Sequence, residues 1–319
     1  PQYRIAVPRG ITLDAKNDSI DLVHCHALTT MGFAAVRASQ NLGVPLIGTF
    51  HTLIPNGVST ITSNKFAQKI GSAIAWRAIR RFYAPFPLVT APSKTIARLL
   101  REHGVENTTV VPNGIDLSKF RPQREAVKLA VRKKLGLKPS DKMILVAGRL
   151  SREKNVDVVI RAYAGFAREN PGSKLVVCGT GPALNENIAL ARRLGVGKRA
   201  VFTGFVPNNV LPAYYSAADA FVTASTFETQ GLTVLEAMAC GTLVLGANAL
   251  AIPDEVKNGK NGFLFEPNAR DCENALEKAL NHTSGKKLRQ IRRNAASSAR
   301  EYSIENATRK LLKAYLKVM

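Results

Sequence analysis

Residues 220–241, with the sequence AFVTASTFETQGLTVLEAMACG, carry three signals of a parallel α/β fold. The apolar run 220–223 predicts a buried strand, and a polar loop with Glu228 follows it. The pattern then changes to a helix over 231–239, and 243–245 predicts the next strand. A strand, helix and strand in this order are typical of a parallel sheet whose two faces are covered by helices.

The same alternation runs along the chain on both sides of one break. Before the break, we predict strands at 20–24, 45–50, 88–91 and 108–111 and helices at 29–42, 66–83 and 95–102. After it, we predict strands at 143–147, 174–178, 200–203, 220–223 and 243–245, and helices at 155–169, 210–216, 231–239, 271–281 and 303–317. The break is the turn sequence Pro112-Asn113-Gly114. The pattern predicts two doubly wound Rossmann-like domains.

Composition limits the class of protein. The chain has 319 residues, with 45 Lys and Arg against 23 Asp and Glu, a formal charge of +22. Such a field attracts phosphates, nucleic acid or an anionic lipid surface, and charge does not choose among them. No stretch approaches the roughly 20 apolar residues of a membrane-spanning helix. The four cysteines lie far apart, so neither a disulfide framework nor a metal cage is expected, and a reducing cytosol is the default.

The loop and helix after residue 223 have the residue types of a donor site. Gly231 permits close approach of the backbone, and the N–H groups of Leu232 and Thr233 are expected to be free at the helix start, where an anion is favoured. Glu236 can bind a diol such as a ribose, and Glu228 can bind sugar hydroxyls. The alternative is that both acids are ordinary solvated side chains.

A second loop, with the sequence GRLSREKN over 148–155, follows the strand at 143–147. Arg149 and Lys154 lie at the carboxyl end of that strand, where ligands of open α/β sheets bind. An Arg and a Lys suit a diphosphate whose negative charge grows as it leaves. The alternative is a solvated basic loop in a basic chain. We expect this loop to face Glu228 within one domain.

Four motifs in the second half resemble the family 4 retaining glycosyltransferases, also called glycosyl transferases group 1. They are Gly148-Arg149-Leu150 with Lys154-Asn155, Gly179-x-Gly181-Pro182, Thr203-Gly204-Phe205-Val206, and Glu228-x7-Glu236. The first half adds the motifs at 21–26, 48–52, 89–93 and 111–116. The resemblance implies the GT-B architecture, in which two Rossmann-like domains face a cleft.

The resemblance also implies domain boundaries. Residues 1–113 would form the acceptor-side domain and 114–302 the donor-binding domain, with the helix at 303–319 packing back on the first domain. Family members begin with a strand and a Gly-rich loop some tens of residues before the strand at Ile20. Because this sequence starts at Pro1, the first domain is expected to be incomplete, and whether the chain is active is left open.

Site roles follow residue by residue from the same resemblance. The implied catalytic residues are His51, Arg149, Lys154 and Glu228, and the implied donor-binding residues are Gly148, Phe205, Val206, Gly231, Leu232, Thr233 and Glu236. Arg149 and Lys154 would hold the diphosphate, the backbone near Phe205 would meet the base, and His51 would lie beside the anomeric centre. The resemblance implies no metal, since the family is metal-independent for this step, and no cofactor, since the nucleotide sugar is a co-substrate.

Two histidine interpretations remain open. His51 could instead be a hydrogen-bonded histidine at a strand end. His24 and His26 share one face of a strand and could suit a metal, but the sequence offers no third ligand, so we interpret them as structural or cleft-lining.

The predicted function is retaining transfer of a hexose from a UDP-glucose or GDP-mannose type of donor to an acceptor hydroxyl. The phrase Phe50-His51-Thr52 resembles the subgroup that glycosylates lipids such as diacylglycerol and phosphatidylinositol. The expected partners are therefore the donor, a lipid or sugar acceptor, and an anionic membrane contacted from the cytoplasmic side. Two alternatives are a nucleotide-sugar epimerase or sugar-phosphate synthase on the same fold, and a non-catalytic basic protein that binds nucleic acid. No nucleic-acid motif is present, and aromatic residues are only 7% of the chain.

The helix at 66–83 alternates Lys and Arg with Phe66, Ile70, Ile74 and other apolar residues. Such a helix could rest on an anionic membrane. The interpretation we favour from sequence is a surface helix whose apolar stripe is in the core.

Overall fold

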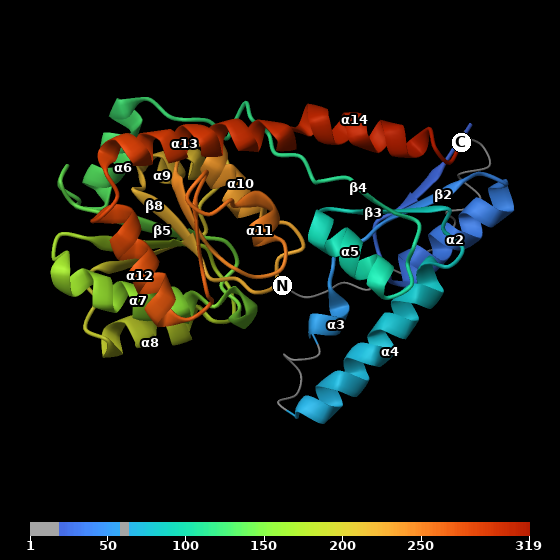
Figure 1. Cartoon of the computed structure of the whole chain (residues 1–319), viewed down its shortest axis with the longest axis horizontal. Helices are drawn as coiled ribbons and strands as arrows, with labels where there is room; N and C mark the ends of the chain where they lie inside the picture. The colour runs from blue at the N-terminus through green and yellow to red at the C-terminus, as the bar shows by residue number, and fades with distance from the viewer. Residues whose placement is uncertain (1–18, 58–63) are drawn as a thin grey trace. The chain divides into compact units, whose positions relative to one another are not determined.

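The computed structural model describes residues 19–57 and 64–319, and the chain divides into two compact units (Figure 1). Unit 1 comprises the chain up to Asn113 together with the carboxyl-terminal segment Glu305–Met319. Unit 2 is Gly114–Ile304. Each unit is built on its own parallel sheet, which confirms the predicted pair of Rossmann-like α/β units.

Unit 1 has a four-stranded sheet in the order β1-β2-β3-β4. Its strands are β1 (Val23–Cys25), β2 (Leu46–Thr49), β3 (Leu88–Ala91) and β4 (Thr108–Val110), and its helices are α2 (Thr30–Leu42), α3 (Ile54–Gly57), α4 (Lys65–Tyr83) and α5 (Lys94–Glu102). The terminal helix α14 (Ile304–Tyr315) packs on this sheet, because Ala314 lies in one buried cluster with Ile47 and Val111. The β2 side chains are all buried, as expected for a strand inside a covered parallel sheet.

Unit 2 has a six-stranded sheet in the order β10-β9-β8-β5-β6-β7. The strands are β5 (Met143–Ala147), β6 (Lys174–Cys178), β7 (Ala200–Gly204), β8 (Ala220–Thr223), β9 (Leu243–Ala247) and β10 (Phe263–Phe265). The helices are α6 (Glu125–Lys134), α7 (Val156–Glu169), α8 (Leu184–Arg193), α9 (Leu211–Ala217), α10 (Leu232–Ala239), α11 (Ile252–Glu255), α12 (Ala269–Leu280) and α13 (Gly285–Ala299), with 3-10 turns η2 (Arg152–Lys154) and η3 (Arg300–Tyr302). Helices α7, α8 and α12 pack together, as do α6, α9, α10 and α13, so the sheet is covered on both faces (Figure 1).

The strand order of unit 2 locates a crevice. The chain proceeds from β5 to β6 on one side and later returns to β8 on the other side. The loops that leave the carboxyl ends of β5 and β8 therefore diverge to opposite faces of the sheet. Ligands of open α/β sheets bind at such a switch point.

The backbone is tightly packed where β5 and β6 end. The N–H of Gly148 donates to the carbonyl of Cys178 at 3.0 Å, and the N–H of Leu150 donates to the carbonyl of Thr180 at 2.9 Å. Gly179 has φ +145°, and a Cβ there would lie 1.8 Å from the carbonyl oxygen of Gly148. Only glycine fits, and this close approach fixes the course of the loop that carries Arg149.

The structure corrects the sequence interpretation of α4 over its first half. Phe66, Ile70 and Ile74 are 74%, 45% and 63% exposed, whereas Ile79 and Phe82 are buried. The apolar stripe therefore reaches the core only near the carboxyl end of the helix, since the first turns extend past the sheet (Figure 1). Within the described ranges, no helix is both long and apolar enough to cross a membrane.

The Gly179 contact predicts a stability difference between two glycines. Gly179→Ala should lower the free energy of unfolding by more than about 3 kcal/mol, because backbone strain of about 1–3 kcal/mol adds to steric overlap with the next loop. Gly195→Ala is the matched control, since Gly195 also has a positive φ of +75° but open space around it. Urea denaturation measures both variants, and equal losses would contradict the packing described.

Candidate active site

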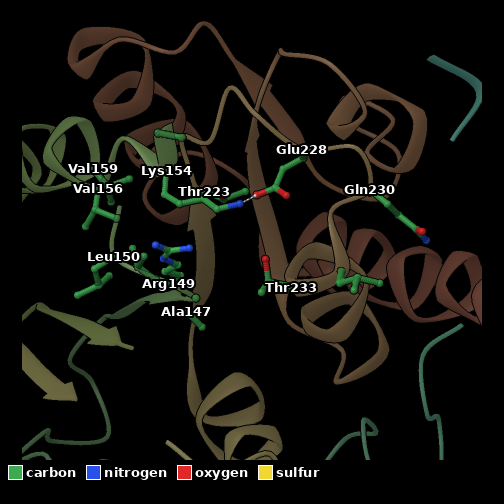
Figure 2. Close-up of a pocket in the computed structure, with 14 residues that line it drawn as sticks. Ala147, Arg149, Leu150, Lys154, Val156, Val159, Thr223, Glu228, Gln230 and Thr233 are labelled. Atoms are coloured by element: carbon green, nitrogen blue, oxygen red, sulfur yellow. Dashed lines mark hydrogen bonds and ion pairs between the residues drawn. The ribbon is translucent and has the colours of Figure 1, made fainter. Parts of the chain in front are cut away.

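A cavity of about 230 Å³ lies at the carboxyl ends of β5 and β8 (Figure 2). Its lining residues are Val146, Ala147, Gly148, Arg149, Leu150, Lys154, Val156, Val159, Thr223, Ala224, Glu228, Gln230, Leu232 and Thr233. The cavity thus occupies the switch point between the two strands. Six of the residues that the sequence singled out line it together: Gly148, Arg149, Lys154, Glu228, Leu232 and Thr233.

An ion pair joins the two loops across the cavity. Lys154 Nζ lies 2.6 Å from Glu228 Oε1, and the two side chains are 27% and 17% exposed (Figure 2). Asn155, the residue after Lys154, has a left-handed backbone conformation with φ 47° and links the two loops through its side chain. Its amide donates to the carbonyl of Ala224 at 3.1 Å and to the hydroxyl of Thr226 at 3.2 Å. The β5 loop and the β8 loop are therefore held in one fixed arrangement.

Arg149 is an uncompensated positive charge in the cavity. Its guanidinium lies inside the same pocket as the ammonium of Lys154 (Figure 2). Over the described residues, no carboxylate lies within ion-pair distance of Arg149, whereas Lys154 is neutralised by Glu228. The cavity therefore has an excess of positive charge and suits an anion.

The start of α10 forms one wall of the cavity and differs from the sequence expectation in one respect. The N–H of Leu232 is not free, because it donates to the carbonyl of Gln230 at 3.0 Å. The chain makes a tight turn there before the helix begins. Thr233 lies in the first helical turn, where backbone N–H groups have no acceptor within the helix. Gly231 precedes the helix, and its N–H donates to Glu255 Oε1 at 2.9 Å.

Glu236 lies one turn further along α10 and is not among the lining residues. The hydroxyl of Tyr215 donates to Glu236 Oε2 at 2.9 Å. Burial raises the pKa of Glu236 to about 7, and the bond from Tyr215 opposes that shift. The carboxyl is therefore poised between its neutral and charged forms near neutral pH.

Phe205 and Val206 follow the edge strand β7 and also lie outside the lining residues. Phe205 is 73% exposed, so its ring is available to a flat partner. The carbonyl of Gly204 accepts a bond of 2.8 Å from the N–H of Gly179, which ties this segment to the end of β6. The assignment of these two residues to a nucleotide base stays a prediction.

His51 belongs to unit 1 and lies in a histidine cluster. His51 Nε2 and His26 Nδ1 share a hydrogen bond of 2.9 Å, while His24 bonds the hydroxyls of Thr49 and Tyr315, each at 2.7 Å. Burial lowers the pKa of His51, and the neighbouring His26 adds to the effect. For the same main reason the pKa of His24 falls to about 4, so both rings are neutral at pH 7. No group of three or more His, Cys, Asp or Glu in the described part of the chain is placed to hold a metal ion.

No role was predicted from the sequence for the residues that support the site, although Asn155 belongs to one of the motifs. Asn155, Tyr215 and Glu255 each bond a loop or a carboxylate of the site, but none contacts the cavity itself. Glu255 had one available signal, because it is an acid inside the apolar pattern Ala-Ile-Pro-Asp-Glu-Val.

Relatives of known activity cover most of this chain. It is 32% identical over 287 residues to the alpha-monoglucosyldiacylglycerol synthase of Streptococcus pneumoniae, which covers 87% of this chain and 64% of that protein. It is 31% identical over 307 residues to the D-inositol 3-phosphate glycosyltransferase of Segniliparus rotundus, with 92% and 65% covered. The chain thus spans slightly less than two thirds of the length of these relatives.

A solved structure and two family models also match this chain. The Anabaena protein HepE in complex with UDP superposes with a TM-score of 0.82 at 22% identity, covering 96% of this chain and 81% of that one, which shows the shared GT-B fold. The model of Glycosyltransferase Family 4 matches residues 1–119, and that of Glycosyl transferases group 1 matches residues 127–298. The sequence motifs, the sheet order and these matches agree, and the chain belongs to the glycosyl transferases group 1 family.

Proposed function

We propose that this chain transfers a hexose from a nucleoside diphosphate sugar to an acceptor hydroxyl, with retention of configuration at the anomeric carbon. The observation that carries the proposal is Arg149, which has no carboxylate within ion-pair distance in the described part of the chain and lies beside the Lys154–Glu228 pair, at the switch point of the unit 2 sheet. The negative charge of a diphosphate complements this positive cavity, and a sugar offers hydroxyls to Glu228. The UDP bound to HepE, a protein with the same fold, supports a nucleotide donor.

The reaction breaks the bond between the anomeric carbon and the β-phosphate oxygen. The electron pair stays on the diphosphate, where Arg149 and Lys154 stabilise the growing charge. The acceptor oxygen bonds the anomeric carbon from the same face, and its proton passes to the leaving phosphate oxygen. This internal-return route needs no carboxylate nucleophile, and Glu228, already paired with Lys154, has the role of binding sugar hydroxyls.

Lys154 would have two partners in turn, first Glu228 and then the donor diphosphate. Its ammonium neutralises Glu228 at 2.6 Å. When the diphosphate arrives, Lys154 shares its charge with the phosphate oxygens, and Glu228 gains sugar hydroxyls as donors. The ion pair therefore keeps both groups in place before the donor binds, which lowers the cost of ordering them.

We propose a lipid acceptor at an anionic membrane surface. The first turns of α4 expose Phe66, Ile70 and Ile74 at a spacing of four residues, so the three side chains share one face. The same helix carries five basic residues: Lys65, Lys69, Arg77, Arg80 and Arg81. An exposed apolar ridge with Lys and Arg beside it is typical of a helix that lies in the interface of an anionic membrane. The synthase of S. pneumoniae, by its name, makes a diacylglycerol glycolipid, which supports the same acceptor class.

Lys154→Ala tests the donor site. We expect transfer to fall by about 100-fold or more, because one preorganised charge at the leaving group is lost. UDP-glucose and GDP-mannose are offered with a diacylglycerol acceptor, and released nucleoside diphosphate is measured. Arg152→Ala is the control, since Arg152 lies two residues away in an exposed pair with Glu186 at 3.3 Å and should leave the rate unchanged. Near-normal turnover of the Lys154 variant would overturn the assignment.

The raised pKa of Glu236 predicts a pH dependence of donor binding. Above about pH 7 the carboxylate is charged and accepts ribose hydroxyls well, and below it the group is protonated, so affinity should fall as pH drops from 8 to 6. Glu236→Gln should bind more weakly at pH 8 and lose this dependence. Calorimetric titration with the intact nucleotide sugar, whose diphosphate does not titrate in this range, measures it. A wild-type affinity that is flat with pH would refute this role.

Membrane contact is tested on α4. The double variant Phe66→Ser and Ile74→Ser should lose most sedimentation with vesicles of phosphatidylglycerol and phosphatidylcholine, because it removes two exposed apolar anchors. Leu312→Ser is the control, since Leu312 is also exposed, at 53%, but lies on α14. Equal binding by the double variant and the wild type would exclude this face as the contact.

A further inference from the structure

A buried acid lies behind the donor loop. Glu255 ends α11 and is only 4% exposed. Its Oε1 accepts the N–H of Gly231 at 2.9 Å. Its Oε2 is also buried and has no hydrogen-bond partner over the described residues, and no Lys or Arg there lies within ion-pair distance. A buried acid without a cation needs an explanation, because an uncompensated buried charge is costly.

The acid is part of a two-point attachment between α11 and the loop that carries Glu228. At one end, the N–H of Ala251 donates to the carbonyl of Glu228 at 3.3 Å. At the other end, Glu255 holds Gly231, the residue directly before α10. The attachments therefore bracket residues 228–231, which supply one carboxylate and one wall of the cavity.

Contact at the second attachment is close. A Cβ on Gly231 would lie 2.6 Å from Glu255 Oε2, so the carboxyl and the loop backbone pack directly together. The backbone carbonyl of Glu255 is held in place as well. Asn261, itself buried, donates to the carbonyl of Glu255 at 3.0 Å and accepts from the N–H of Lys257 at 2.6 Å. The carboxyl is thus held on a rigid support and sets the position of Gly231.

We infer that Glu255 is a positioning residue that acts as a neutral carboxylic acid, holding Gly231 so that the start of α10 is aligned for a diphosphate. The inference rests on the proposed function for its ligand. Glu255 does not touch the cavity, so it acts through the loop and not on the donor.

Electrostatics supports the neutral form. Burial raises the pKa of Glu255 to about 8, the bond from Gly231 opposes the shift, and the nearby carboxylates of Glu228 and Asp254 add to it. Tyr302 is the other titratable neighbour, and it is neutral at pH 7 because burial raises its own pKa to about 12. A charged Glu255 would place a negative charge behind a helix N-terminus that is to receive an anion.

The sign of the pH effect follows from this shift. The pKa rises from an ordinary 4.5 to about 8 on folding, so the stabilising contribution of Glu255 is complete below the unfolded value and is lost as pH rises through about 8. The loop and its affinity for an anion should therefore weaken on the alkaline side. Glu255→Gln keeps an acceptor for Gly231 but cannot ionise, so it should remove this dependence.

Two readouts on the full chain test the inference. Hydrogen exchange at residues 229–234 reports the loop without any ligand, and calorimetry with UDP and with GDP, between pH 6 and 9, reports the anion site. We expect Glu255→Ala to speed the exchange and to weaken nucleotide binding about tenfold at pH 7, as for the loss of one buried hydrogen bond. We expect Glu255→Gln to resemble the wild type at pH 7 in both readouts and to lack its alkaline decline.

The control separates positioning from general stability. Ile291 is fully buried on α13 in the same unit, and Ile291→Val or Ile291→Ala, whichever matches the stability loss of Glu255→Ala, should change neither readout. The inference is overturned if Glu255→Ala leaves exchange at 229–234 unchanged, if Glu255→Gln behaves as Glu255→Ala does, or if the control moves both readouts equally. A wild-type chain that binds neither nucleotide would contradict the proposed function instead, and the exchange result would still decide the role of Glu255.

Discussion

The position of β5 between β6 and β8 is the constraint on which the site depends. Because the chain continues from β5 to β6 on one side and later returns to β8 on the other, the loops at the carboxyl ends of β5 and β8 separate and leave a cavity between them. The first loop carries Arg149 and Lys154, and the second carries Glu228. The ion pair between Lys154 and Glu228 joins these two loops across the cavity. Sheet order therefore brings together side chains that are 74 residues apart in the chain.

The charge balance around this cavity explains how acids can surround a site for an anion. Glu228 is neutralised by Lys154, and burial raises the pKa of both Glu236 and Glu255 into the neutral range. Arg149 keeps its full charge with no carboxylate within ion-pair distance over the described residues. The local excess of positive charge thus comes from the pairing of Glu228 with Lys154 and from the neutral form of Glu255, and the formal charge of +22 for the whole chain would not reveal it.

Much of the fold could be predicted because parallel strands buried on both faces leave a direct pattern in sequence. The runs 143–147, 174–178 and 220–223 coincide with β5, β6 and β8. Helices made mostly of charged and polar residues were missed, α6 and α8 among them, because they bury few side chains and so contain few apolar residues to reveal a pattern. The exposed ridge of α4 was misjudged for a related reason: periodicity shows that an apolar face exists, but not what covers it. In the site, charged residues next to strand ends could be found, whereas the bonds of Asn155 and Glu255 depend on long-range packing and could not.

We propose above that the cavity beside Arg149 binds the diphosphate of a nucleotide sugar. Calorimetric titration of the chain with UDP-glucose and with GDP-mannose, repeated with Arg149→Ala, tests it most directly. We expect the wild type to bind at least one of the two donors and the variant to bind it at least about tenfold more weakly, as for the loss of one charge-assisted contact. Binding of neither donor by the wild type, or equal binding by the variant, would contradict it.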